Sequence, residues 1–180
     1  IFSNIYILNQ KKNTQNTYIK KKLNEKKIYK SLLNNFNASL VSMMIKKSVF
    51  DNKKNSFDSN FDHIGDFDFI LRMSKKYKFG YIEEPLAIYR LHDNNLTKKN
   101  RLNEIEELET WVENNNLKLN KKEIMPINNK LLERKFIYFK LLGEFKKSLI
   151  IYSKINLKLK LKLFILIFLP KKVLEKILSF

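Results

Sequence analysis

The stretch 66–78 constrains the fold most, because at helical spacing its apolar residues cover most of the circumference of a helix. A helix of this kind is buried on nearly all sides, so other elements must pack around it. The apolar run 79–88 follows directly and predicts a strand as one neighbour. The apolar residues of the helix are Phe67, Phe69, Ile70, Leu71, Met73 and Tyr77.

Two more apolar runs in the first half predict strands. Residues 1–8 are short and apolar enough for a strand buried on both faces, and the alternation in 39–45 predicts a second core strand. In the strand predicted for 79–88, Pro85 marks either a sheet edge or a break, because proline donates no ladder hydrogen bond. Helical spacing is also present at Ile28, Leu32, Leu33 and Phe36.

Polar stretches separate these elements, and the second half of the chain is helical in pattern. Residues 9–27, 51–60 and 91–100 predict loops. Helices are predicted from 101 to about 114–116, from 131 to a stop at Gly143, and over a short segment near 145–152. We therefore expect an α/β fold with few strands in residues 1–100, followed by a helical extension in 101–180.

The last segment combines lysines with a large apolar content. Leucines alternate with lysines over 157–163, and 164–169 is continuously apolar before Pro170. An interfacial helix on anionic lipid is the preferred prediction, and an edge strand is the alternative. The apolar run is too short to cross a bilayer, which needs about 20 residues.

Charge is distributed unevenly along this chain of formal net charge +18. Residues 57–100 balance seven basic against seven acidic residues, whereas residues 1–56 hold twelve against two and residues 144–180 nine against two. Both histidines lie in the balanced region, where polar chemistry is therefore expected. The chain has no cysteine, which excludes disulfides and thiolate metal sites.

The balanced region contains several motifs in a definite order. They are a strand-like run at 39–46, Lys47-Ser48, Gly65-Asp66-Phe67-Asp68 with Leu71-Arg72, and Glu84-Pro85-Leu86-Ala87 followed by Tyr89-Arg90 and His92. In this order they resemble the acceptor-side half of a family 2 glycosyltransferase with the GT-A fold. The resemblance covers about residues 1–100. That family usually has Glu-Asp-x-Asp at the helix start, so Gly65 is a departure.

The resemblance implies roles for four residues. Asp66 would be the general base that takes the proton from the acceptor hydroxyl, and Asp68 would help to shape the substrate site. Arg90 would neutralise the departing diphosphate, and His92 would contact phosphate or metal. A divalent cation, Mn²⁺ or Mg²⁺, is expected in the full-length enzyme, although this chain has no Asp-x-Asp motif to hold it.

Each of these residues also has a purely structural alternative. Asp66 would be only a helix N-cap, since aspartate is a preferred cap residue. Asp68 and Arg72 are spaced for an ion pair along one helix face. Arg90 would pair with Glu83 or Glu84, and His92 would be exposed. The loop residues Asp58, Asp62 and His63 are expected to have turn or loop roles.

The leading hypothesis is a fragment of an inverting glycosyltransferase whose nucleotide-binding half precedes Ile1. It would transfer a sugar from a nucleotide-sugar donor to a surface polysaccharide or glycolipid, in the cytoplasm or peripherally at the inner face of the plasma membrane. Residues 1–180 alone are expected to be inactive, and no nucleic-acid partner is expected. The alternative is a non-catalytic basic module that binds membrane or nucleic acid.

Overall fold

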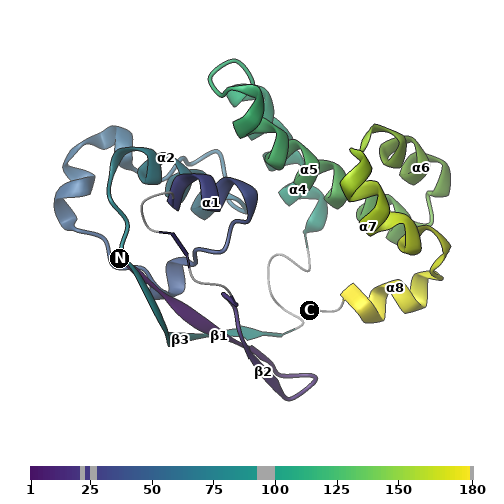
Figure 1. The fold of residues 1–180 in the computed structure, drawn as a ribbon, viewed down its shortest axis with the longest axis horizontal. Coiled ribbons are helices and arrows are strands. Elements are labelled where there is room, and N and C mark those ends of the chain that lie inside the picture. The colour runs from purple at the N-terminus through teal and green to yellow at the C-terminus, as the bar shows by residue number, and fades with distance from the viewer. Residues whose placement is uncertain (21–22, 25–27, 93–99, 179–180) are drawn as a thin grey trace. The chain divides into compact units, whose positions relative to one another are not determined.

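The computed structural model describes residues 1–20, 23–24, 28–92 and 100–178. The chain divides into two compact units, Ile1–Lys99 and Asn100–Phe180. The first unit contains strands and helices, and the described part of the second is helical (Figure 1). The fold is therefore α/β, and the division lies one residue from the one expected after residue 100.

The first unit contains a three-stranded sheet of order β2-β1-β3 (Figure 1). β1 (Phe2–Asn9) pairs in parallel with β3 (Tyr81–Leu91), and both strands lie where the apolar runs predict them. β2 (Thr14–Thr17) pairs antiparallel with β1, inside a stretch predicted to be a loop. Its four polar side chains are all exposed, so no apolar alternation marks it as a strand.

Pro85 lies where the β1–β3 register is irregular. Ser3 pairs with Ile82, whereas Asn4 pairs with Pro85, so β3 contains extra residues at this point. β3 is also the last strand on its side of the described sheet. Both alternatives for Pro85, a sheet edge and a break in pairing, are therefore confirmed.

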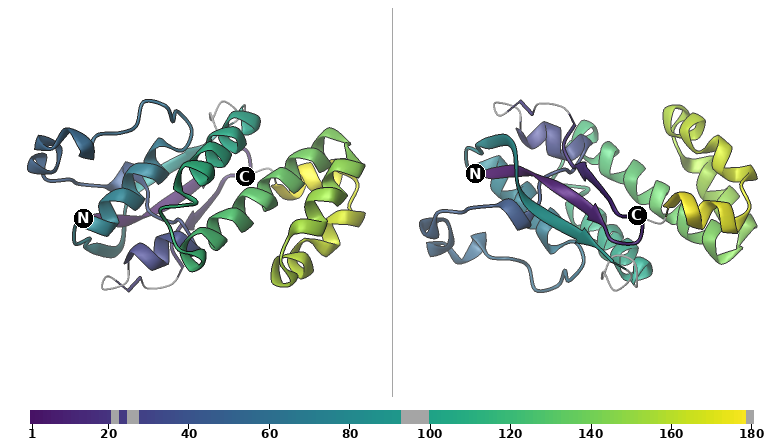
Figure 2. Two further views of the ribbon diagram at one scale, coloured as in Figure 1. Left: turned by 90° about the horizontal axis from the view of Figure 1, so that it is seen from above. Right: turned by 90° about the horizontal axis from the view of Figure 1, so that it is seen from below.

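Two helices lie on one face of this sheet, α1 (Ile28–Asn34) and α2 (Gly65–Lys76) (Figures 1 and 2). The α2 helix is confirmed within two residues of its predicted ends, and its burial extends around most of its circumference. Short 3-10 turns, η3 (Lys47–Asp51) and η4 (Lys53–Asn55), precede it. The buried residues of α2 are Gly65, Phe67, Asp68, Phe69, Ile70, Leu71, Met73 and Ser74.

The core strand predicted for residues 39–45 is wrong. This segment forms a 3-10 turn, η2 (Leu40–Ser42), and a single bridge between Phe2 and Met43. The Ser42 hydroxyl replaces a ladder, because Oγ donates to the Ser3 carbonyl (2.8 Å) and accepts from the Ser3 N–H (3.3 Å). The Ser42 side chain thus provides hydrogen-bond partners for the backbone N–H and carbonyl of Ser3, which a neighbouring strand would otherwise provide.

Five helices make up the described part of the second unit. They are α4 (Arg101–Asn115), α5 (Lys121–Leu142), α6 (Phe145–Lys154), α7 (Leu157–Phe168) and α8 (Lys171–Leu178). α5 begins ten residues before the predicted start because Asn120 and Glu123 form a capping box. It ends at Gly143, as predicted, where φ is 80°.

The C-terminal segment packs on α5. Phe136, Ile155 and Leu163 form the buried centre of the contact, and Leu159, Leu166 and Ile167 on α7 are among the partly buried residues around it. Residues 157–168 are helical, so the edge-strand alternative is wrong. Pro170 follows the end of α7, and its carbonyl accepts from the N–H groups of Val173 and Leu174, which begins the unpredicted helix α8.

The described helices include none that is both long enough and apolar enough to span a membrane. This agrees with the short length of the apolar run in α7.

Lys130 on α5 is a lysine in an unfavourable environment. Its pKa is lowered to about 8, mainly by burial and also by the nearby Arg134, whereas Glu133 and Glu104 act in the opposite direction. The ordinary value is 10.5. The folded protein therefore releases this proton at a lower pH than the unfolded chain does.

Replacing Lys130 with Met is expected to raise the free energy of unfolding at pH 7, by up to about 3 kcal/mol, because it removes a buried charge. Between pH 8 and 10.5 the unfolded state of the parent binds more protons, so the parent gains stability with rising pH. The variant should lack this gain. Urea unfolding from neutral pH to about pH 10 measures both effects.

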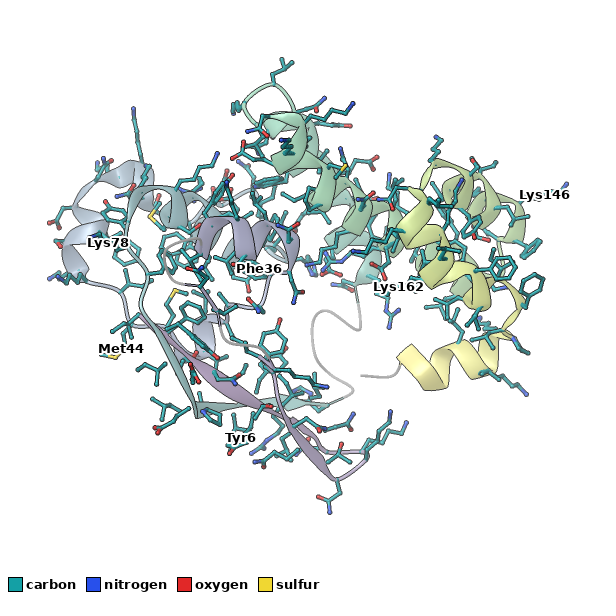
Figure 3. All side chains as sticks on the ribbon, in the orientation of Figure 1. Tyr6, Phe36, Met44, Lys78, Lys146 and Lys162 are labelled. Atoms are coloured by element: carbon teal, nitrogen blue, oxygen red, sulfur yellow. The ribbon has the colours of Figure 1, made fainter. Side chains whose placement is uncertain are left out.

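The exposed Lys146 on α6 provides the matched control, because Lys146→Met removes an equal charge from the surface (Figure 3). Its stability and pH dependence should follow those of the parent. A Lys130→Met variant that is less stable than Lys146→Met at pH 7 would contradict the prediction.

Candidate functional site

Asp66 lies in the first turn of α2, after the N-cap position. The N-cap position is Ile64, which makes no side-chain cap bond, so the cap alternative for Asp66 is wrong. The Asp66 carboxylate is partly buried, and its Oδ1 accepts a hydrogen bond from the Phe67 N–H (2.7 Å). A carboxylate in this position is stabilised in its ionised form by the helix dipole.

The path of the chain determines which end of the sheet Asp66 faces. β1 and β3 are parallel, and α2 ends only a few residues before β3 begins (Figure 2). The last turn of α2 is therefore tied to the amino end of β3, and the helix runs back along the sheet. Its first turn, with Asp66, lies toward the carboxyl ends of the two parallel strands, the usual position of ligand sites in such sheets.

Arg90 and His92 also lie at the carboxyl end of β3. Arg90 is the penultimate residue of the strand and pairs in register with Leu8, and His92 follows the strand directly. Both side chains are exposed. β3 thus carries both residues toward the same end of the sheet as the first turn of α2, but Arg90 lies on the exposed face of β3 with Leu86 and Ile88, whereas the helices cover the other face (Figure 1).

Asp68 is buried, and the predicted ion pair with Arg72 is confirmed. Arg72 Nε lies 2.8 Å from Asp68 Oδ2. The two other guanidinium nitrogens donate to the carbonyls of Lys54 (3.1 Å) and Ser56 (2.8 Å). These contacts assign Asp68 a positioning role: it orients Arg72, which in turn holds the loop before α2. Direct contact between Asp68 and a substrate stays a prediction.

Aromatic stacking holds the same loop against α2. The Phe69 ring stacks on Phe57, with centroids 4.2 Å apart, and on Phe50, at 5.8 Å. The buried Asn55 amide donates to the Val49 carbonyl (2.7 Å) and to the Tyr77 hydroxyl (2.8 Å). Ring stacking and the Asn55 hydrogen bonds therefore hold the loop in place. The loop leads directly into the first turn of α2, so these contacts also position that turn.

Asn37 is a polar residue near this turn that the sequence pattern does not identify. Its neighbour Phe36 packs edge-on against Phe67, with ring centroids 5.2 Å apart. Within the described residues, Asn37 Oδ1 is a buried side-chain oxygen with no hydrogen-bond partner. A single asparagine in a polar stretch has no distinctive spacing, so only the structure identifies it.

The described residues do not fit a divalent cation by themselves. Metal sites of the expected kind need several clustered ligands, and no group of three or more His, Asp or Glu side chains that could hold a metal occurs in 1–20, 23–24, 28–92 or 100–178. His92 as a metal ligand stays a prediction. Asp58 has the expected turn role, because its Oδ1 accepts from the Asn60 N–H at 3.0 Å.

Comparison of the chain with models of protein families, with curated proteins and with solved structures gave no match.

Replacing Arg72 with Met is expected to lower the free energy of unfolding by about 2 kcal/mol, because it leaves the buried Asp68 carboxylate without its cation. This figure is below that for fully buried pairs because the Arg72 side chain is 32% exposed. Urea unfolding measures the change. Asp68→Asn should cost less, about 1 kcal/mol, because the amide oxygen still accepts from Arg72.

The exposed Lys53 in the same loop provides the control, since Lys53→Met also removes one positive charge. If Arg72→Met and Lys53→Met change stability equally, the Asp68–Arg72 pair does not hold the loop.

Proposed function

We propose that this chain is the acceptor-side half of an inverting glycosyltransferase, with Asp66 as the general base. The observation that carries the proposal is the position of the Asp66 carboxylate, in the first turn of α2 and toward the carboxyl ends of β1 and β3. The ordered motifs from Lys47 to His92 support it independently. The GT-A fold, of which this unit would be a part, belongs to the same proposal.

The reaction requires one proton acceptor and one stabiliser of the leaving group. Asp66 accepts the proton of the acceptor hydroxyl as that oxygen bonds to the anomeric carbon of the donor sugar. The bond between this carbon and the nucleotide diphosphate breaks from the opposite side, so the configuration inverts. The Arg90 guanidinium neutralises charge that develops on the departing diphosphate, and His92 donates a hydrogen bond to a phosphate oxygen.

The substrates follow from this chemistry. The donor is a nucleotide-activated sugar, and the acceptor is a glycan or a lipid-linked glycan with a free hydroxyl. We expect a divalent cation in the full-length enzyme, where it would supply electrostatic stabilisation of the diphosphate. Because the described residues do not form its site, none of the steps above depends on it. A cytoplasmic location, or one at the inner face of the plasma membrane, belongs to the same proposal.

Replacing Asp66 with Asn in the full-length protein is expected to reduce sugar transfer by roughly 100-fold or more, because the amide cannot accept the proton. The amide is similar in size and can still accept the Phe67 N–H, so folding should change little. Transfer of radiolabelled sugar from a panel of nucleotide sugars to endogenous acceptors in membranes measures activity. Circular dichroism and thermal unfolding measure folding.

Asp51→Asn is the matched control, because Asp51 is an exposed carboxylate in η3, before the same helix. This variant should transfer sugar at the parent rate. If Asp66→Asn also transfers sugar near the parent rate, Asp66 is structural and the proposed function loses its catalytic group.

A further inference from the structure

Helix α7 has two apolar sides, and only one of them is covered by the described chain. Leu163 is buried in the contact with α5. On the opposite side, five large apolar residues follow the spacing of a single helix face and are between 52% and 74% exposed. We call this surface the α7 stripe, and its members are Leu157, Leu161, Phe164, Ile165 and Phe168.

Lysines border the α7 stripe on both sides. At about 100° per residue, Lys158 lies beyond one edge of the stripe and Lys160 beyond the other. The exposed Lys172 lies at the start of α8, directly after the stripe. Lys162 is farther around the helix and is paired with Glu133, with Nζ 2.7 Å from Oε1 (Figure 3). An apolar face with a cationic border is the arrangement of helices that lie in a membrane interface.

We propose that the α7 stripe docks α7 on an anionic lipid surface, with the helix axis parallel to the membrane plane. Leu157, Ile165 and the other stripe residues enter the boundary between headgroups and acyl chains. Lys158, Lys160 and Lys172 contact the lipid phosphates. A helix of 12 residues is about 18 Å long, so it can lie in the interface but cannot span the hydrocarbon.

Charge favours lipid over the other occupants. A second copy of the chain would bring the same lysines to the border of the stripe, and each copy has a net charge of +18. A nucleic acid would satisfy the lysines, but its phosphate backbone offers nothing apolar to cover five exposed Leu, Phe and Ile side chains. Anionic lipid provides both the negative charge and the apolar layer. This inference does not depend on the proposed function.

Vesicle sedimentation with the full chain tests the docking. Vesicles of phosphatidylcholine with phosphatidylglycerol should bind the chain at least about 100-fold more tightly than vesicles of phosphatidylcholine alone, with release as salt rises. A triple variant, Leu161→Gln, Ile165→Gln and Phe168→Gln, should lose at least about 100-fold in affinity for the anionic vesicles. Because all three residues are exposed, circular dichroism should be unchanged.

The control variant replaces three exposed apolar residues outside α7, Met44→Gln, Leu86→Gln and Leu117→Gln. It should bind as the parent does. A separate lysine variant, Lys158→Gln with Lys172→Gln, should weaken binding by about fivefold per lysine, whereas Lys53→Gln with Lys146→Gln should have a smaller effect.

A fluorescent reporter tests depth directly. Trp111 is the single tryptophan and is buried in α4, so Phe168→Trp adds one exposed indole to the stripe. Anionic vesicles should shift its emission to the blue, and brominated acyl chains should quench it. Leu117→Trp, outside the stripe, should show neither effect.

The proposal is overturned if neutral and anionic vesicles bind equally, or if the stripe and control triple variants bind alike. If both lysine variants lose the same vesicle affinity and the stripe variant still binds an oligonucleotide, the lysines bind polyanions in general and the proposal of lipid docking is wrong. A stripe variant that changes from dimer to monomer in sedimentation velocity, without losing vesicle binding, would assign the stripe to a second copy.

Discussion

Burial of α2 is the constraint on which the first unit depends. A helix that is apolar around most of its circumference must be enclosed, and the sheet covers only one side of it. The loop before α2 covers another, through stacking of Phe57 on Phe69 and through the carbonyls that accept from Arg72. The ion pair with Asp68 orients that guanidinium. The Asp68–Arg72 pair, with its carboxylate buried and its guanidinium partly exposed, therefore adds polar contacts to the loop that the apolar residues alone do not provide.

Periodic apolar patterns predicted most of the helices and two of the strands, because burial of one face imposes the period of the element. The failures occur where another interaction determines the structure. Residues 39–45 alternate like a strand, but Ser42 bonds the edge of β1 with its side chain. The start of α5 depends on the Asn120–Glu123 capping box in a region with few apolar residues, and β2 has no buried face.

The candidate site was less predictable than the fold, because its geometry depends on contacts between distant segments. The sequence motifs identified Asp66, Arg90 and His92, and the parallel pairing of β1 with β3 places them toward one end of the sheet. Nothing in the local sequence identified Asn37 or Asn55. Their environments arise from packing around α2, which a single sequence does not encode as a pattern.

Asp66 and Asp68 lie in the same turn of helix but differ in burial and in their contacts. Asp68 is buried and holds Arg72 at 2.8 Å, so a proton on this carboxylate would break the clamp on the loop. Asp66 is only partly buried, and its Oδ1 accepts from the N–H of the next residue in the same turn. A general base must exchange a proton in every catalytic cycle without loosening the fold. The Asp68 charge is required to keep the loop in place, so Asp68 is the less suitable of the two carboxylates for the proposed base.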